Sequence, residues 1–369
     1  MHAVIVVNDT TYAYKLRREL LMQLVKTGYQ VTVIAEILSY KKELEEIGCR
    51  LMDVQTGRHG TNVFQDVRLC WHYYRMICKC RPDFVLTFNI KPNIYAGLVC
   101  RMRRIPYYPN ITGLGKPLGT PGRLQKLTTF LYKIGIGKAT AVMFQNKGNE
   151  QFFREKKMLP KRARTVLLPG SGVNLQEHRL EPYPSDTGDG KWVFLTIGRI
   201  MHDKGIDEVI CAAKQIRQEY PDAVFRLIGD YDDNYEEVIQ EAVAQGVIEY
   251  AGAAEDVHAQ IKASHATIHA SYHEGMSNVL LESAACGRPV IATDVYGCRE
   301  IFEEGVSGFG CKARDVDSLV KGIRRFIHLP YAQKVQMGLA GRRKMEQEFD
   351  RNIVVEKYLE EINGCRVGV

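Results

Sequence analysis

Residues 271–282 read SYHEGMSNVLLE and place Glu274 and Glu282 on either side of an expected helix start. The hydroxyl of Ser277 suits an N-cap, and Asn278 opens an apolar helical turn behind it. The first amides of a helix have no intrahelical acceptor and carry partial positive charge, so they bind phosphate groups. We therefore predict a diphosphate seat at the amides of Asn278, Val279 and Leu280. The residues around it that we assign to donor binding are Gly275, Met276, Ser277, Asn278 and Val279.

The two glutamates fit the remaining parts of a nucleotide sugar. Glu282 lies one turn inside the predicted helix, on the side of Asn278, where its carboxylate can accept hydrogen bonds from ribose hydroxyls. Glu274 lies in the preceding loop and would position the hydroxyls of the donor sugar. The alternative is that Glu274 is a solvated loop charge and Glu282 a surface residue of the helix. A glutamate pair taken alone favours this alternative.

A second motif supports the donor site. Residues 192–197 read WVFLTI, which is typical of a buried strand, and Gly198 and Arg199 follow it directly. Lys204 stands in the same loop. Open α/β sheets bind ligands at the carboxyl ends of their strands, and an Arg fork with a Lys point charge suits a diphosphate leaving group. The predicted catalytic residues are therefore Arg199, Lys204 and Glu274. Gly198 and Glu282 complete the predicted donor-binding set.

With these motifs the chain resembles glycosyltransferase family 4, the retaining sugar-nucleotide enzymes with the GT-B fold. The matching residues are Gly198-Arg199, Lys204-Gly205, Glu274-Gly275, Glu282 and GRPVIA at 287–292. The resemblance covers essentially the whole chain, is specific over 192–310 and is loose before residue 170. It implies an α/β protein with two facing doubly wound Rossmann-like domains and an inter-domain cleft.

The length of 369 residues also favours more than one domain. We expect an acceptor-binding domain at 1–170 and a nucleotide-sugar-binding domain at 171–345. A C-terminal helix at 346–369 should return toward the first domain, as it does in GT-B proteins. The opening strand–helix–strand pattern lacks a GxGxxG fingerprint, which argues against a nicotinamide site.

Polar residues at the expected strand ends of the first half are candidates for the acceptor side: Asn8, Asp9, Arg17, Asn89, Lys91, Thr112 and Gly113. The segment around Arg17, LRREL, resembles a helix start in family members with lipid acceptors. Asn89 and Lys91 fit an ordinary solvated loop equally well. Two features depart from the family pattern: Asp9-Thr10-Thr11 replaces a Gly-Gly pair, and the 106–115 segment has no histidine. A histidine-centred mechanism is therefore not carried over, and no catalytic base is assigned.

The net charge of +7 is distributed unevenly. Residues 1–170 carry 28 Lys and Arg against 11 Asp and Glu, while the rest carry 22 against 32. The stretch from Phe84 to Asn149 holds ten basic residues and no acidic one. Such a surface favours a polyanionic partner, either nucleic acid or an anionic membrane. Helical spacing at 122–137 fits a core-packed helix and an interfacial helix on lipid headgroups equally well.

The spacing of the cysteines and the hydropathy of the sequence indicate which metal sites and which cellular location to expect. The ten cysteines include no CxxC pair, which predicts a reduced cytosolic chain with neither a zinc site nor a disulfide framework. We see no signal peptide or membrane span in the sequence. We expect no cofactor and no bound metal, and the family resemblance agrees on the metal.

The resulting hypothesis is a retaining, metal-independent glycosyltransferase. It would move Gal, GalNAc or GlcNAc from a UDP-sugar to a lipid-diphosphate-linked saccharide in bacterial surface polysaccharide or glycan synthesis. It would be cytoplasmic and peripheral at the inner face of the cell membrane, held by its basic N-terminal domain. One alternative is a sugar-nucleotide epimerase of the same fold. The other is a nucleic-acid-binding protein, which would leave the Arg/Lys and Glu/Glu motifs unexplained; we expect no nucleic-acid partner.

Overall fold

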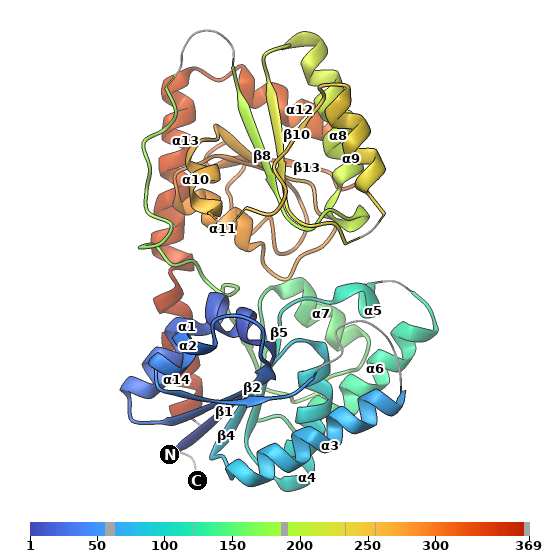
Figure 1. The fold of residues 1–369 in the computed structure, drawn as a ribbon, viewed down its shortest axis with the longest axis vertical. Helices are drawn as coiled ribbons and strands as arrows, with labels where there is room; N and C mark the ends of the chain where they lie inside the picture. Colours follow the sequence, from blue (N-terminus) through green and yellow to red (C-terminus); the bar gives the residue numbers. More distant parts are fainter. Residues whose placement is uncertain (56–62, 120, 186–190, 233, 255, 365–369) are drawn as a thin grey trace. The chain divides into compact units, whose positions relative to one another are not determined.

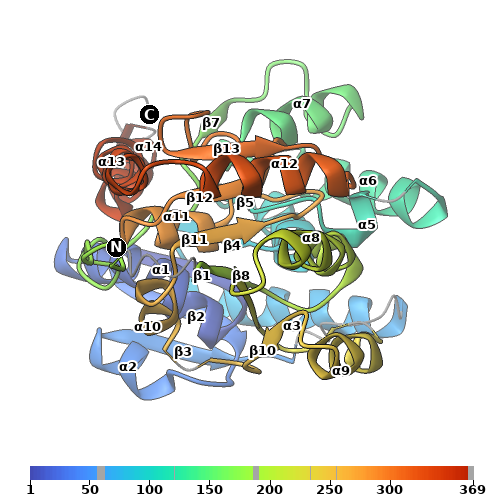
Figure 2. The ribbon, with the colours of Figure 1, turned by 90° about the horizontal axis from the view of Figure 1, so that it is seen from above.

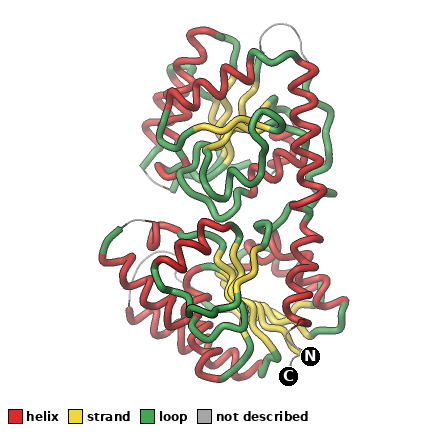
Figure 3. The backbone as a smooth tube through the Cα atoms, turned by 180° about the vertical axis from the view of Figure 1, so that it is seen from behind, coloured by secondary structure: helices red, strands yellow, loops and turns green. Residues whose placement is uncertain are grey.

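The computed structural model describes the chain except for residues 56–62, 120, 186–190, 233, 255 and 365–369. Two compact units make up the structure: Met1–Ser171 with Asn352–Val369, and Gly172–Arg351. In each unit the strands lie in the middle and the helices around them (Figure 3). Residues 346–351 thus group with the second unit, although the sequence assigned them to the C-terminal helix that returns to the first.

The first unit is built on seven parallel strands in the order β3-β2-β1-β4-β5-β6-β7. The strands are β1 (His2–Asp9), β2 (Gln30–Glu36), β3 (Cys49–Asp53), β4 (Phe84–Phe88), β5 (Tyr107–Ile111), β6 (Val142–Phe144) and β7 (Thr165–Leu167). The order reverses between β1 and β4, so this is where a doubly wound sheet opens a crevice at its carboxyl edge. Both faces of β1 are covered, because Val4 and Ile5 are fully buried.

Helices cover both faces of this sheet (Figure 1). Leu20 of α1, Leu44 of α2 and Val354 of α14 belong to the core on one face. Tyr73 of α3 and Val99 of α4 belong to the core on the other. The helices of this unit are α1 (Thr10–Lys26), α2 (Lys41–Glu46), α3 (Val63–Cys80), α4 (Gly97–Arg103), α5 (Gly115–Gly119), α6 (Arg123–Ile136), α7 (Lys147–Glu155) and α14 (Arg351–Gly364), with a π-helical turn at Pro92–Ala96.

The second unit has six parallel strands in the order β10-β9-β8-β11-β12-β13. They are β8 (Val193–Ile197), β9 (Val224–Ile228), β10 (Glu249–Tyr250), β11 (Ala266–His269), β12 (Val290–Thr293) and β13 (Gly308–Cys311). Figure 2 shows β8, β11, β12 and β13 side by side. The order again reverses once, between β8 and β11, which places the switch point of this sheet there.

Two layers of helices flank the second sheet as well. Ile210 of α8, Ile239 of α9 and Ile323 of α12 share one core cluster. Leu281 of α11 packs with Met345 in another. The helices are α8 (Ile206–Glu219), α9 (Glu236–Ala244), α10 (Val257–Lys262), α11 (Asn278–Ala285), α12 (Val316–Ile327) and α13 (Tyr331–Lys344), with a 3₁₀ turn at His202–Lys204 and a π-helical turn at Met345–Phe349. The predicted α/β class with two doubly wound sheets is confirmed.

One local prediction needs correction. The C-terminal helix begins at Arg351 rather than at residue 346, because Asp350 adopts an extended conformation (ψ 132°) between the π-helical turn and α14. The helix expected at 122–137 is present as α6 and packs through Tyr132 and Gly135, while Leu124 and Leu127 are exposed. A Cβ on Gly135 would lie 2.6 Å from the carbonyl oxygen of Ile94, so the close approach selects the small residue for the buried face.

Candidate active site

The two predicted donor motifs follow neighbouring strands of the second sheet. Strand β11 pairs directly with β8, with Thr267 in register with Leu195, although two strands separate them in sequence. The loops at 198–205 and 270–277 therefore leave the same carboxyl edge at the switch point. Gly205 (φ +69°) brings them together: a Cβ there would lie 2.2 Å from the carbonyl oxygen of Ala270. The topology thus juxtaposes Lys204 with the segment that holds Glu274.

An ion pair joins the lysine of one loop to the glutamate of the other. Lys204 Nζ donates to Glu274 Oε1, and both side chains are largely buried. His269, the last residue of β11, has its Nε2 2.9 Å from the same carboxylate oxygen and 3.1 Å from Ser277 Oγ. His269 was not among the residues singled out from the sequence. Its position at a strand end before the motif was the available signal.

These neighbours control the charge of Glu274. Burial acts to raise the pKa of its carboxyl, but the ammonium of Lys204 and the imidazole of His269 outweigh burial and hold that pKa well below its usual range. Glu274 is therefore a carboxylate at neutral pH. It can accept hydrogen bonds from sugar hydroxyls but has no proton to donate.

The N-terminus of α11 has the features of an anion site. Ser277 caps the helix, because its Oγ accepts from the amide of Leu280. Asn278 Oδ1 is buried and has no hydrogen-bond partner within the described part of the chain. Met276 belongs to one core cluster and Val279 packs against another, so they offer a ligand their backbone rather than their side chains.

Glu282 lies one turn further along α11. Its side chain is 22% exposed, and its Oε1 is 4.0 Å from His178 Nε2. The carboxylate is therefore neither deeply buried nor freely solvated. It remains a candidate for the ribose contact that its place on the helix predicts.

Arg199 differs from Lys204 in its surroundings. Its side chain is 62% exposed, and it pairs with Asp232, a residue absent from the predicted site. Asp230 and Asp232 follow β9 with Asp-x-Asp spacing. A ligand diphosphate would have to compete with Asp232 for the guanidinium. Among the residues that the structure describes, a Cβ on Gly198 (φ +153°) would meet no atom within 4 Å, so its surface is open to a ligand.

The candidates for the acceptor side gather at the switch point of the first sheet. Asn8 at the end of β1 donates its backbone N–H to Asn89 Oδ1 after β4, over 3.3 Å. Asn89 adopts a left-handed conformation (φ +72°), a strained backbone state that is common at functional sites. Thr112 and Gly113 follow β5, the next strand. Asp9 ends β1 and Lys91 follows β4, so the structure brings six of the seven candidates to this edge.

Three of the seven candidates also have structural partners. Asp9 caps α1 through the amide of Tyr12. Lys91 Nζ lies 3.2 Å from Asp66 Oδ1. Arg17 is buried, with its guanidinium 4.5 Å from the ring centroid of Phe88. These contacts give Asp9, Lys91 and Arg17 roles in holding the first unit together.

Comparison with known families accounts for both units. The model for glycosyl transferases group 1 matches residues 181–344, and that for glycosyl transferase 4-like proteins matches residues 4–146. The chain is a glycosyltransferase of family 4. The resemblance drawn from its motifs is confirmed.

The curated proteins similar to this glycosyltransferase have different named activities. It is 24% identical over 361 residues to the N,N'-diacetylbacillosaminyl-diphospho-undecaprenol alpha-1,3-N-acetylgalactosaminyltransferase of Campylobacter jejuni, covering 94% of each chain. It is 26% identical to the glycogen synthase of Mycobacterium tuberculosis over 42% of this chain and 38% of that one.

Solved structures confirm the GT-B fold. Sucrose-phosphate synthase from Thermosynechococcus elongatus matches with a TM-score of 0.80 at 17% identity, over the whole of both chains. Anabaena HepE in complex with UDP matches with a TM-score of 0.76 at 15% identity, over 99% of this chain and 100% of that chain. At these identities the likeness shows the fold of this glycosyltransferase and leaves its substrates to be argued from the site.

Proposed function

We propose that this glycosyltransferase moves Gal, GalNAc or GlcNAc from a UDP-sugar to a lipid-diphosphate-linked saccharide, in the synthesis of a bacterial surface polysaccharide or glycan. Transfer retains the anomeric configuration and needs neither a metal nor a cofactor. The enzyme works at the cytoplasmic face of the cell membrane. Two similar proteins support the substrates: the Campylobacter relative acts on a diphospho-undecaprenol sugar, and HepE binds UDP.

One observation carries the donor half of the proposal. At the switch point of the second sheet a lysine, a carboxylate and a capped helix N-terminus converge: Lys204, Glu274 and the first amides of α11. A diphosphate needs positive charge and amide donors, and a sugar needs a carboxylate acceptor. Glu282, one helical turn further along, is placed for a ribose. The order of these groups matches the order of parts in a nucleotide sugar.

The barrier in such a transfer is departure of the nucleotide diphosphate from the anomeric carbon. Fixed positive charge aimed at the departing oxygen lowers this barrier. Lys204, Arg199 and the backbone amides of Asn278 and Val279 supply that charge in our proposal. The bond from the anomeric carbon to the diphosphate breaks, the acceptor oxygen forms the new bond, and its proton passes to the departing phosphate or to water. Glu274 holds the sugar through its hydroxyls, because its carboxylate stays ionised.

The acceptor half of the proposal is supported by the surface of the first unit. Helix α6 exposes Leu124, Leu127 and Phe130, and its exposed basic residues include Arg123 and Lys126. An apolar stripe beside positive charge is typical of a helix that rests on anionic lipid. No helix in the described ranges is long and apolar enough to span a bilayer. We propose peripheral attachment through this basic unit.

The two glutamates give the sharpest test of the donor site. Glu282→Gln should weaken binding of bare UDP, because a ribose contact is lost with or without the sugar. Glu274→Gln should leave bare UDP binding nearly unchanged and lower sugar transfer by about a hundredfold or more. Calorimetry with UDP and a coupled assay for released UDP measure the two effects. Glu241→Gln, an exposed change on α9, is the control. Equal losses of UDP affinity in both variants would contradict this division of roles.

A panel of sugar nucleotides separates the proposal from its alternatives. Release of UDP that depends on an added lipid-diphosphate saccharide supports transfer. Interconversion of the donor sugar without any acceptor would support an epimerase, and a shift of RNA or DNA at physiological salt would support nucleic-acid binding. Either of these outcomes without transfer would overturn the proposal.

A further inference from the structure

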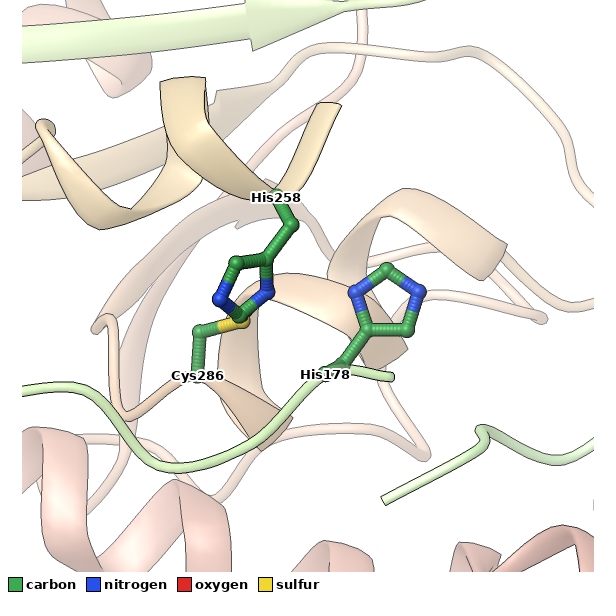
Figure 4. A group of neighbouring side chains, drawn as sticks. All are labelled: His178, His258 and Cys286. Carbon is green, nitrogen blue, oxygen red and sulfur yellow. The ribbon is translucent and has the colours of Figure 1, made fainter. Parts of the chain in front are cut away.

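Three side chains that the donor site does not use meet in the second unit. His178 belongs to the segment that follows Gly172, His258 to α10, and Cys286 to the end of α11. One potential ligand atom from each lies within 4.8 Å of the other two. Figure 4 shows the three side chains turned toward a common point. No pattern of spacing in the sequence predicts this group, because its members are far apart in the chain.

Cys286 and His258 already stand at the separation of two metal ligands. Cys286 Sγ lies 3.4 Å from His258 Nδ1. In a tetrahedral zinc site, with Zn–S of about 2.3 Å and Zn–N of about 2.0–2.1 Å, the sulfur and nitrogen are about 3.6 Å apart. Cys286 is fully buried in an apolar cluster with Leu195 and Ile261. Thiolate and imidazole are the ligand types that zinc prefers.

A carboxylate orients His258 from its outer side. His258 Nε2 lies 3.0 Å from Glu181 Oε1, and the Glu181 side chain is 5% exposed. Arg179 and Lys262 hold this carboxylate in place. A proton on Nε2 satisfies Glu181 and leaves the lone pair of Nδ1 directed at Cys286. Histidine ligands of metals usually donate their outer N–H to a carboxylate in this way.

His178 repeats the arrangement. Its Nδ1 is buried and lacks a hydrogen-bond partner among the residues that the structure describes. Its Nε2 is on the side of Glu282, with 4.0 Å to Oε1, and Figure 4 shows the other ring nitrogen turned toward His258. In the tautomer that has its proton on Nε2, the lone pair of Nδ1 is available to a metal ion.

We propose that His178, His258 and Cys286 bind one zinc ion or a similar borderline-soft divalent cation. The ion takes one nitrogen from each histidine and the sulfur of the cysteine, whose thiol proton is released to solvent. A water or a neighbouring carboxylate fills the fourth position. The site fastens the segment around His178 to α10 and α11, so the ion stabilises the second unit and takes no part in departure of the diphosphate.

Metal titration of the full-length chain, stripped with a chelator, tests the site. We expect one Zn²⁺ per chain with a rise in Tm, and a thiolate-to-metal absorption band when Co²⁺ is used instead. Cys286→Ser and His258→Gln should both abolish the tight binding. Cys211→Ser, which changes the exposed cysteine of α8, should leave binding and spectrum unchanged. Glu181→Gln should weaken affinity by about 10- to 100-fold, as loss of an outer carboxylate does elsewhere.

Circular dichroism establishes that each variant is folded, and His258→Gln keeps the test decisive if Cys286→Ser unfolds. Absence of stoichiometric Zn²⁺ binding in the wild-type chain would overturn the proposal. So would a Co²⁺ spectrum or stoichiometry that persists unchanged in folded Cys286→Ser or His258→Gln. In either case the three side chains form only a hydrogen-bonded packing cluster.

Discussion

At the scale of single residues, Lys204 and Glu274 determine one another's charge. Each is largely buried, and each has the other as its direct ionic partner. A buried charge that loses its partner is costly, so each residue stabilises the charged form of the other. In the proposed function Lys204 faces the diphosphate and Glu274 faces the sugar, so the two side chains are electrostatically coupled, and His269 contributes a hydrogen-bonding ring.

Removal of the lysine tests the Lys204–Glu274 ion pair. Lys204→Ala should lower turnover by about a hundredfold or more, the scale of losing one transition-state charge partner. It should also lower Tm, because Glu274 is left buried without its counter-ion. Lys214→Ala on the exposed side of α8 should change neither quantity. Steady-state kinetics and thermal melts provide the measurements, and turnover near that of wild type would refute the role of Lys204.

The pH dependence of stability is a second consequence at this scale. The pKa of Glu274 lies lower in the folded state than its ordinary value of 4.5, so the unfolded chain binds the proton more readily. Its contribution to stability is present above about pH 4.5 and is lost as the pH falls below that value. Urea unfolding from about pH 3 to 7 should show this loss in the wild type. In Glu274→Gln the free energy of unfolding should depend less on pH. Identical profiles would mean that the ion pair contributes no net stability.

At the scale of elements, α6 combines a glycine-mediated contact with an outward apolar stripe. Gly97 of α4 lies against Gly135, where an added Cβ would be 2.7 Å from a carbonyl oxygen. Because the small residues take the inner face, Leu127 and Phe130 are left outside. Helical periodicity identified the element and its apolar stripe. It did not identify which face is buried, because backbone contact between helices favours the smallest residues over the most apolar ones.

Liposome sedimentation tests the role of this helix. Arg123→Glu with Lys126→Glu should release the protein from anionic vesicles, since each basic residue near such a surface contributes about 1 kcal/mol. Binding by the wild type should fall as salt rises, because screening shortens electrostatic reach to about 8 Å at physiological ionic strength. Lys321→Glu, at an exposed position of α12 in the other unit, is the control, and Lys126→Glu alone is its charge-matched comparison. Donor hydrolysis should stay unchanged in all variants.

Failure of the wild type to bind anionic vesicles at low salt would remove the membrane from the proposal. A soluble acceptor would then be the better hypothesis. Equal release by Lys321→Glu would instead point to overall charge rather than to α6.

At the scale of the whole molecule, the C-terminal helix belongs to the core of the N-terminal unit. Tyr358 of α14 donates its hydroxyl to Asn110 Oδ1 of β5, and Arg164 pairs with Glu361. Val354 and Ile362 are buried in the cluster that covers β1 and β4. The core of the first unit is therefore complete only when α14 has been synthesised.

Tyr358→Ala should reveal this dependence. Loss of a fully buried aromatic side chain should cost about 3–5 kcal/mol of unfolding free energy. Hydrogen exchange should accelerate in β1, β4 and β5, while β8 and β11 keep wild-type protection. Glu356→Ala, an exposed change on the same helix, should leave both sheets as they were. Uniform loss of protection in both units would contradict an independent core for each.

The sequence determined the class of fold, most of the strands and the two donor motifs. Apolar runs such as 192–197 mark buried strands, and Ser277 before an apolar turn marks a helix start, because these signals are local. The Arg/Lys and Glu/Glu motifs with the family pattern were sufficient to identify a glycosyltransferase.

Tertiary structure alone decided which residues meet. His269 joins Glu274 because β11 ends beside the motif, and Asp232 reaches Arg199 because β9 pairs with β8. The group of His178, His258 and Cys286 arises from three segments with no common spacing. Local patterns report the conformation of neighbours in the chain. Contacts between distant segments depend on the order of strands in the sheet and on the side chains packed between them, and no local pattern encodes either.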